Sequence, residues 1–211
     1  MIKSEGTIDF LIKPAKIISV IFHPLFMPVY GMIIIFSAPT LYGYLPFEVK
    51  KLLFLIVLIN NVILPLSLLP FLKYRNIISS WTVENRRERI IPLLITTLLY
   101  ASTSFIVMKF PIPVFLKSFI FAAFFVSLAI TVINFWWKIS IHSAGAGALS
   151  ALVLILSLKM YSSLVWYLIM VIIAGGLILS SRLKLNSHSP QEVWLGFLTG
   201  SMGLGFFMWF F

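Results

Sequence analysis

Residues 181–192 read Ser-Arg-Leu-Lys-Leu-Asn-Ser-His-Ser-Pro-Gln-Glu, the densest polar stretch in the last third of an otherwise apolar chain. Two more polar islands interrupt the sequence, Glu-Asn-Arg-Arg-Glu-Arg at 84–89 and Lys-Ile-Ser-Ile-His-Ser at 138–143. The apolar runs beside the islands are mostly about 18 residues or longer, which is the length that crosses a bilayer. The islands therefore divide the chain into membrane spans.

Composition supports this interpretation. The 211 residues are 61% hydrophobic and 10% charged, whereas roughly 25% charged residues are usual in soluble domains. We expect an all-α polytopic transmembrane helical bundle of six or seven spans, with an amphipathic lead at 1–16 and a single transmembrane domain at 17–211. The expected spans are about 17–38, 52–72, 90–108, 114–137, 144–158, 164–180 and 193–211. His23-Pro24 is expected to kink the start of the first span without taking part in chemistry.

The span count places all three islands on one membrane face. From Arg89 the chain crosses twice before Lys138, and from His142 it crosses twice before Arg182, so each island returns to the same side. The net charge of +10 comes from basic residues at span ends, which suit anionic lipid head groups rather than nucleic acid. We expect a bacterial inner membrane protein in contact with membrane lipids. The orientation of the protein in the membrane stays open. The face that carries the islands has more Lys and Arg than the opposite face, but the excess is small once the candidate phosphate ligands are left out of the count.

The shared face carries side chains for phosphate chemistry. Arginine guanidinium groups match phosphate oxygens, two histidines offer a nucleophile and an acid near neutral pH, and a carboxylate can orient a histidine. The chain has no cysteine and no acidic cluster on this face, so we expect phosphoryl transfer without metal or cofactor. The inventory of this face includes Arg86, Arg87, Arg89, Ser140, His142, Arg182, His188 and Glu192.

Helix-start signals accompany both histidines. Ser189, Pro190 and Glu192 form a capping-box pattern, which places His188 just before a helix N-terminus that favours phosphate. Ser143 is expected to cap the span near 144, with His142 just outside it. We expect Glu192 to serve either the capping box or His188, since one rotamer can hardly do both.

Around His188 the chain resembles the type 2 phosphatidic acid phosphatase superfamily of membrane lipid phosphatases. The third motif of that family is Ser-Arg, five residues, His, three residues and Asp. Here these places hold Ser181, Arg182, His188 and Glu192, with Glu in place of Asp. The downstream residues Pro190, Val193 and Gly196 are also similar to the family.

The other two motifs are matched less closely. The second, Pro-Ser-Gly-His, is represented by Ile139, Ser140, Ile141 and His142, which keep the Ser and the His. The first, Lys, six residues and Arg-Pro, corresponds in character to Arg86, Arg87, Arg89 and Pro92, but no Lys stands at the expected distance. The resemblance covers about residues 84–200.

The resemblance implies a function and residue roles. His188 would attack phosphorus and form a phosphohistidine, Glu192 would orient and charge-stabilise His188, and His142 would protonate the leaving oxygen. The phosphate oxygens would be held by Arg182, Ser140 and one or more of Arg86, Arg87 and Arg89. The expected substrate is a lipid phosphate or pyrophosphate, and the oligomeric state is not predicted.

Two alternatives remain open from the sequence. One is a catalytically weak relative that binds or moves anionic lipids, in keeping with the eroded second motif. The other is a transporter, suggested by Asn60, Asn61 and the prolines within the spans, although two amides in a span also serve as hydrogen-bond partners between helices. The Arg86–Arg89 cluster also suits a topological anchor. Gly196 and Gly200, four residues apart, are expected to allow close helix packing.

Overall fold

The computed structural model describes residues 5–81, 83 and 85–210, with side chains from residue 11 onward. The polar islands at 84–89, 138–143 and 181–192 are called the first, second and third island in chain order, and Glu84 of the first island lies outside the described residues. Over these residues the chain is helical and contains no strand. The elements in order are α1 (Glu5–Ile21), η1 (Pro24–Phe26), α2 (Met27–Ser37), η2 (Leu41–Tyr44), α3 (Phe47–Leu58), the π-helical turn η3 (Ile59–Ile63), α4 (Leu64–Tyr74), α5 (Ile90–Met108), α6 (Val114–Asn134), α7 (Ile141–Met160), α8 (Val165–Lys184) and α9 (Pro190–Phe210).

Seven helical stretches of the described chain are long and apolar enough to cross a membrane. The first joins most of α1 to α2, the second joins α3 to α4, and each of the other five is one helix. The predicted polytopic helical bundle is therefore confirmed, and the protein is an integral membrane protein.

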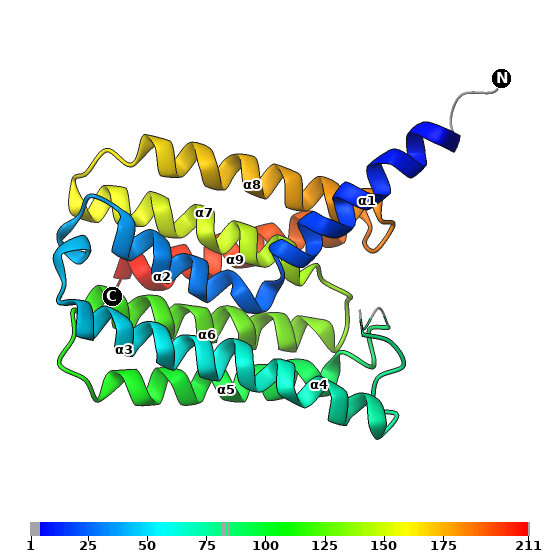
Figure 1. The fold of residues 1–211 in the computed structure, drawn as a ribbon, viewed down its shortest axis with the longest axis horizontal. Helices are drawn as coiled ribbons and strands as arrows, with labels where there is room; N and C mark the ends of the chain where they lie inside the picture. The colour runs from blue at the N-terminus through cyan, green and yellow to red at the C-terminus, as the bar shows by residue number, and fades with distance from the viewer. Residues whose placement is uncertain (1–4, 82, 84, 211) are drawn as a thin grey trace.

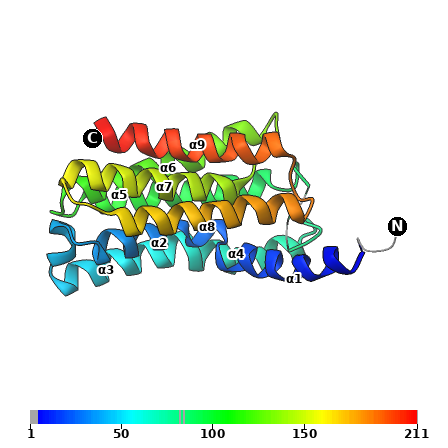
Figure 2. The ribbon, with the colours of Figure 1, turned by 90° about the horizontal axis from the view of Figure 1, so that it is seen from above.

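The helices run back and forth along one axis, with the connecting segments gathered at the two ends (Figure 1). Helix α7 is the central element and contacts α2, α6, α8 and α9. Seen from above, α9 forms one outer side of the bundle and α1 to α4 form the other (Figure 2). Helix α1 extends obliquely beyond the bundle, at the end opposite the C-terminus (Figure 1).

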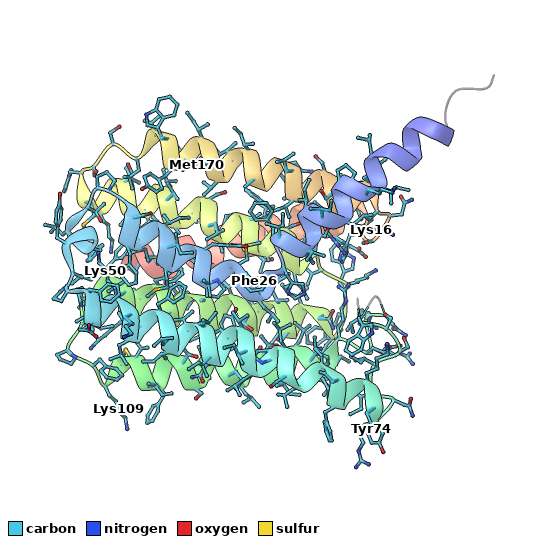
Figure 3. All side chains as sticks on the ribbon, viewed as in Figure 1. Lys16, Phe26, Lys50, Tyr74, Lys109 and Met170 are labelled. Atoms are coloured by element: carbon cyan, nitrogen blue, oxygen red, sulfur yellow. The ribbon has the colours of Figure 1, made fainter. Side chains whose placement is uncertain are left out.

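The outer surface matches a lipid environment. Exposed side chains along the spans include Leu98, Phe105, Ile172 and Met202. Exposed aromatic residues occur at both ends, as the aromatic belts of membrane proteins do; examples are Tyr44, Tyr161 and Trp166 at one end and Tyr74 and Trp136 at the other. Figure 3 places Lys16 and Tyr74 at one end and Lys50 and Lys109 at the opposite end. Polar and charged groups therefore mark two faces of one membrane protein.

The first span is broken at His23-Pro24, as predicted. Pro24 has no N–H to continue the ladder of α1, and the chain turns through η1 before α2 begins. The last carbonyls of α1 then take other donors: Val20 O accepts from His23 N at 3.3 Å, and Ile21 O accepts from the Tyr30 hydroxyl at 2.7 Å. The break leaves the end of α1 open to partners outside the helix.

The second span is interrupted at its paired amides. The buried Asn61 accepts a hydrogen bond from the Thr103 hydroxyl of α5, at 2.7 Å from Oδ1. The predicted helix–helix hydrogen bonding is therefore confirmed for Asn61.

Glycines bring α7 and α9 into backbone contact. A Cβ on Gly200 would lie 1.8 Å from the Ala144 carbonyl oxygen, and one on Gly196 would lie 2.4 Å from the Ser140 carbonyl oxygen. The predicted close packing is confirmed. Because the Gly196 contact joins the first half of α9 to Ser140 at the start of α7, it holds the second and third polar islands together.

Candidate functional site

The three polar islands meet at the right-hand end of the bundle in Figure 1. Arg89 Nη1 donates to the Ile139 carbonyl at 3.4 Å, Lys138 Nζ donates to the Ser187 carbonyl at 2.8 Å, and the backbone N–H of Ser140 donates to the Glu192 carbonyl at 3.2 Å. The common face inferred from the span count is confirmed.

The five residues between Arg182 and His188 form a helix end and a tight turn. Asn186 has a positive φ of 50°, its N–H donates to the Leu183 carbonyl at 3.0 Å, and the Ser187 N–H donates to the Arg182 carbonyl at 3.2 Å. These are the two hydrogen bonds of a Schellman motif, which ends a helix at a left-handed residue. The motif fixes where His188 emerges relative to Arg182.

The third island continues into a capping box. The Glu192 N–H donates to Ser189 Oγ at 3.3 Å, and the Ser189 N–H donates to Glu192 Oε2 at 3.1 Å. The same Oε2 lies 2.8 Å from His188 Nδ1. The expectation that Glu192 serves only one of these roles is wrong, because one carboxylate oxygen has two lone pairs and accepts from both groups.

His188 is neutral at pH 7. Burial, followed by the charges of Arg89, Lys138 and Arg182, lowers the pKa of His188 to about 3. The Glu192 carboxylate favours the charged ring, but burial and three cations outweigh it. A neutral ring that donates from Nδ1 to Glu192 keeps its lone pair on Nε2. His188 is therefore held in the tautomer that a nucleophile requires.

The second island begins α7 one turn earlier than expected. Ser140 is the N-cap, in an extended conformation with φ −81° and ψ 103°. Its Oγ accepts from the Ser143 N–H at 3.4 Å and lies 2.8 Å from Ser143 Oγ. The prediction that Ser143 caps this helix is wrong, because Ser143 already lies inside it. His142 is consequently the second residue of α7 and not a residue before the helix.

The end of α1 fixes His142, a contact that the sequence did not predict. His142 Nε2 lies 3.1 Å from the Ser19 carbonyl oxygen, and a carbonyl only accepts, so Nε2 carries a proton. Arg182 Nη1 donates to the Ser19 hydroxyl at 3.3 Å. The rings of His23 and His142 stand edge to face, with centroids 5.7 Å apart. All three histidines of the chain thus lie at this end of the bundle.

A cavity of about 220 Å³ begins at these side chains. Its charged and imidazole lining comes from His23, Arg89, His142, Arg182 and His188. The rest of the wall is mostly apolar and comes largely from α2, α4, α5, α6 and α7, with Leu68, Leu72, Leu93, Phe119, Val126 and Ala148 among its residues. Donors at one end and hydrocarbon beyond them suit an amphiphile with an anionic head group.

Not every predicted ligand lines this cavity. Arg86 Nη1 donates to the Asn134 carbonyl at 3.3 Å and to the Phe135 carbonyl, at the C-terminal end of α6. Arg87 is exposed, and the fully buried hydroxyl of Ser140 is engaged in the cap of α7. Of the arginine cluster, Arg89 alone lines the cavity. It is buried, and its Nε donates to the Val83 carbonyl at 2.6 Å.

Comparison of the chain with known protein families, with curated proteins and with solved structures gives no match.

Proposed function

We propose that this protein is a membrane lipid phosphatase and a divergent member of the type 2 phosphatidic acid phosphatase superfamily. The single observation that carries the proposal is the His188–Glu192 pair, 2.8 Å apart, on a cavity that joins two arginines and His142 to an apolar wall. A neutral histidine with an engaged Nδ1 is suited to attack, and a guanidinium group is suited to hold phosphate oxygens.

The proposed reaction has two steps. The Nε2 lone pair of His188 attacks phosphorus, the bond between phosphorus and the leaving oxygen breaks, and the bond electrons stay on that oxygen. The Glu192 carboxylate stabilises the positive charge that develops on the His188 ring, and His142 supplies a proton to the leaving oxygen. Water then cleaves the N–P bond and releases inorganic phosphate.

The position of His142 adds one requirement. Its Nε2–H is donated to the Ser19 carbonyl, so the proton for the leaving group has to be on Nδ1. The negative charge of a bound phosphate favours the doubly protonated ring that this step requires. After transfer, the neutral ring presents an Nδ1 lone pair that can accept a proton from the attacking water. One group then acts as acid and afterwards as base.

Phosphate release tests this proposal. The purified protein in detergent, with a chelator present, is assayed on a panel of phosphatidic acid, phosphatidylglycerol phosphate, a polyprenyl diphosphate and a lipid A phosphate. We expect release from at least one lipid by the wild type and none by His188→Asn. Arg87→Gln is the control, because Arg87 belongs to a polar island on the same face but is exposed and does not line the cavity. Release that survives His188→Asn would contradict the assignment of the nucleophile.

A further inference from the structure

We propose that His23 is a third functional histidine, which donates a hydrogen bond to the leaving half of a lipid diphosphate. This inference rests on the proposed function and narrows its substrate class. His23 lines the cavity together with His142, Arg182 and His188. The sequence alone offered only a helix-start role for it.

The tautomer of His23 is set by its own turn. The Leu25 N–H donates to His23 Nδ1 at 3.4 Å, where His23 is the N-cap of η1. A ring nitrogen that accepts carries no proton, so the neutral ring has its proton on Nε2. His23 therefore offers one N–H donor, at Nε2. His188 has the opposite tautomer, with its proton on Nδ1 and its lone pair on Nε2.

Its position puts that donor on the leaving-group side. In the proposed reaction the leaving oxygen lies on the side of phosphorus away from His188 and next to His142. The His23 ring is in edge contact with the His142 ring, and its chain neighbours Pro24 and Leu25 line the cavity beside it.

A donor at this place favours a substrate with acceptors on its leaving half. The alcohol released from a phosphate monoester needs one proton, which His142 supplies. The leaving half of a diphosphate is a lipid monophosphate with charged, non-bridging oxygens, which are strong acceptors. His188 Nε2 bonds to the terminal phosphorus, the bond from that phosphorus to the bridging oxygen breaks, and the electron pair leaves with the lipid monophosphate. His23 Nε2–H holds an oxygen of that monophosphate.

Two substitutions at His23 separate the donor from the cap. His23→Asn keeps an acceptor near the position of Nδ1 for the Leu25 N–H and removes the donor at Nε2, and Asn is a favoured N-cap. His23→Gln places an amide donor near the position of Nε2 and weakens the cap. The substrates are dodecyl diphosphate and dodecyl monophosphate, which share one tail.

We expect His23→Asn to lower kcat/KM for the diphosphate by about ten- to a hundredfold, the usual effect of losing a hydrogen bond to a charged group. The monophosphate should change by less than about threefold, and His23→Gln should restore most of the diphosphate activity. Equal losses on both substrates, or an active His23→Asn beside an inactive His23→Gln, would overturn the proposal.

Binding separates this inference from the proposed function. The probes are the dodecyl ester of methylenediphosphonic acid, which is not hydrolysed between its phosphorus atoms, and dodecylphosphonate. We expect His23→Asn to weaken binding of the first probe about tenfold or more and of the second by less than about threefold. If no lipid is hydrolysed but this selective loss appears, the phosphatase proposal fails and the diphosphate site stands. If lipids are hydrolysed but His23→Asn binds both probes like the wild type, only the role of His23 fails.

Discussion

Replacing Glu192 separates its structural role from its proposed chemical one. Its Oε2 accepts from the Ser189 N–H and from His188 Nδ1, so Glu192→Ala removes both acceptors. Loss of a capping interaction costs about 1 kcal/mol. The His188 side chain is only 1% exposed, and leaving its N–H unsatisfied costs about 1–3 kcal/mol. We therefore expect Glu192→Ala to lower the free energy of unfolding by about 2–4 kcal/mol.

Glu192→Gln keeps an oxygen that can accept from both groups but removes the negative charge. Gln is an accepted partner in a capping box, so the free energy of unfolding should fall by less than about 1 kcal/mol. Phosphate release should fall about a hundredfold or more, because the charge that develops on His188 loses its counter-ion. Glu192→Ala should lose at least as much activity.

Reversible unfolding of the wild type and both variants in mixed micelles, paired with phosphate release, measures the two effects. An unfolding free energy that is unchanged in Glu192→Ala would contradict the hydrogen bonds assigned to Oε2. Full activity in Glu192→Gln would refute the argument that the carboxylate charge assists His188.

Three further outcomes test the fold and the charge of the site. Gly200→Ala should lower the free energy of unfolding by about 3 kcal/mol or more, because its Cβ would lie 1.8 Å from the Ala144 carbonyl. A Cβ on Gly176 would have no neighbouring atom within 4 Å, so Gly176→Ala should leave the free energy of unfolding unchanged or raise it by up to about 1 kcal/mol. Equal effects of the two substitutions would refute the backbone contact at Gly200. Asn186→Gly should be tolerated and Asn186→Val should destabilise by about 1 kcal/mol or more, since residue 186 is left-handed; equal stabilities would contradict that turn. The pKa of His188 falls from 6.5 to about 3 on folding, so the unfolded chain binds a proton at His188 more readily than the folded protein. The free energy of unfolding should therefore be highest above about pH 6.5 and fall as the pH is lowered below that value. The His188 contribution to this loss should reach about 2 kcal/mol at pH 5 and vanish in His188→Asn; an unchanged pH slope in that variant would contradict the buried neutral ring.

The spans and their common face were predictable because they depend on local properties. A run of apolar residues long enough for a bilayer forms a helix whichever way the chain crosses the membrane. Two crossings then return the chain to its starting side. The glycine pair in α9 was also predictable, since Gly196 and Gly200 lie on one face of a helix and permit backbone contact. The hydrogen bond of the Asn61 amide to a neighbouring helix was predictable because an unpaired polar group within a span is costly.

The composition of the site was only partly predictable. The contact between His142 and Ser19 joins residues 123 positions apart, and no spacing rule reports such a pair. The available signal was Pro24, which ends α1 and leaves its last carbonyls in need of other donors. Attention to those carbonyls would have pointed to Ser19 as an acceptor and to the turn at His23.

Local hydrogen bonding decided the remaining differences. The sequence predicts the cap at Ser143, whereas the extended backbone of Ser140 and the hydrogen bond from the Ser143 N–H make Ser140 the cap. The sequence alone gives Arg86, Arg87 and Arg89 the same charge in the same polar island, so it does not distinguish which of them lines the cavity. The structure distinguishes them by position: Arg89 turns inward immediately before α5, and Arg86 binds carbonyls at the end of α6.

The most direct test of the account is to find the phosphate on the protein. The wild type is mixed with a hydrolysed lipid phosphate, quenched under conditions that preserve phosphohistidine, and its peptides are analysed by mass spectrometry. Because the chain contains three histidines, each is assigned separately. The account predicts phosphate on the peptide that contains His188, absent from His188→Asn and accumulating in His142→Gln if water attack is slowed. Phosphate on His23 or His142 instead, or turnover with no phosphorylated histidine at any time, would contradict it.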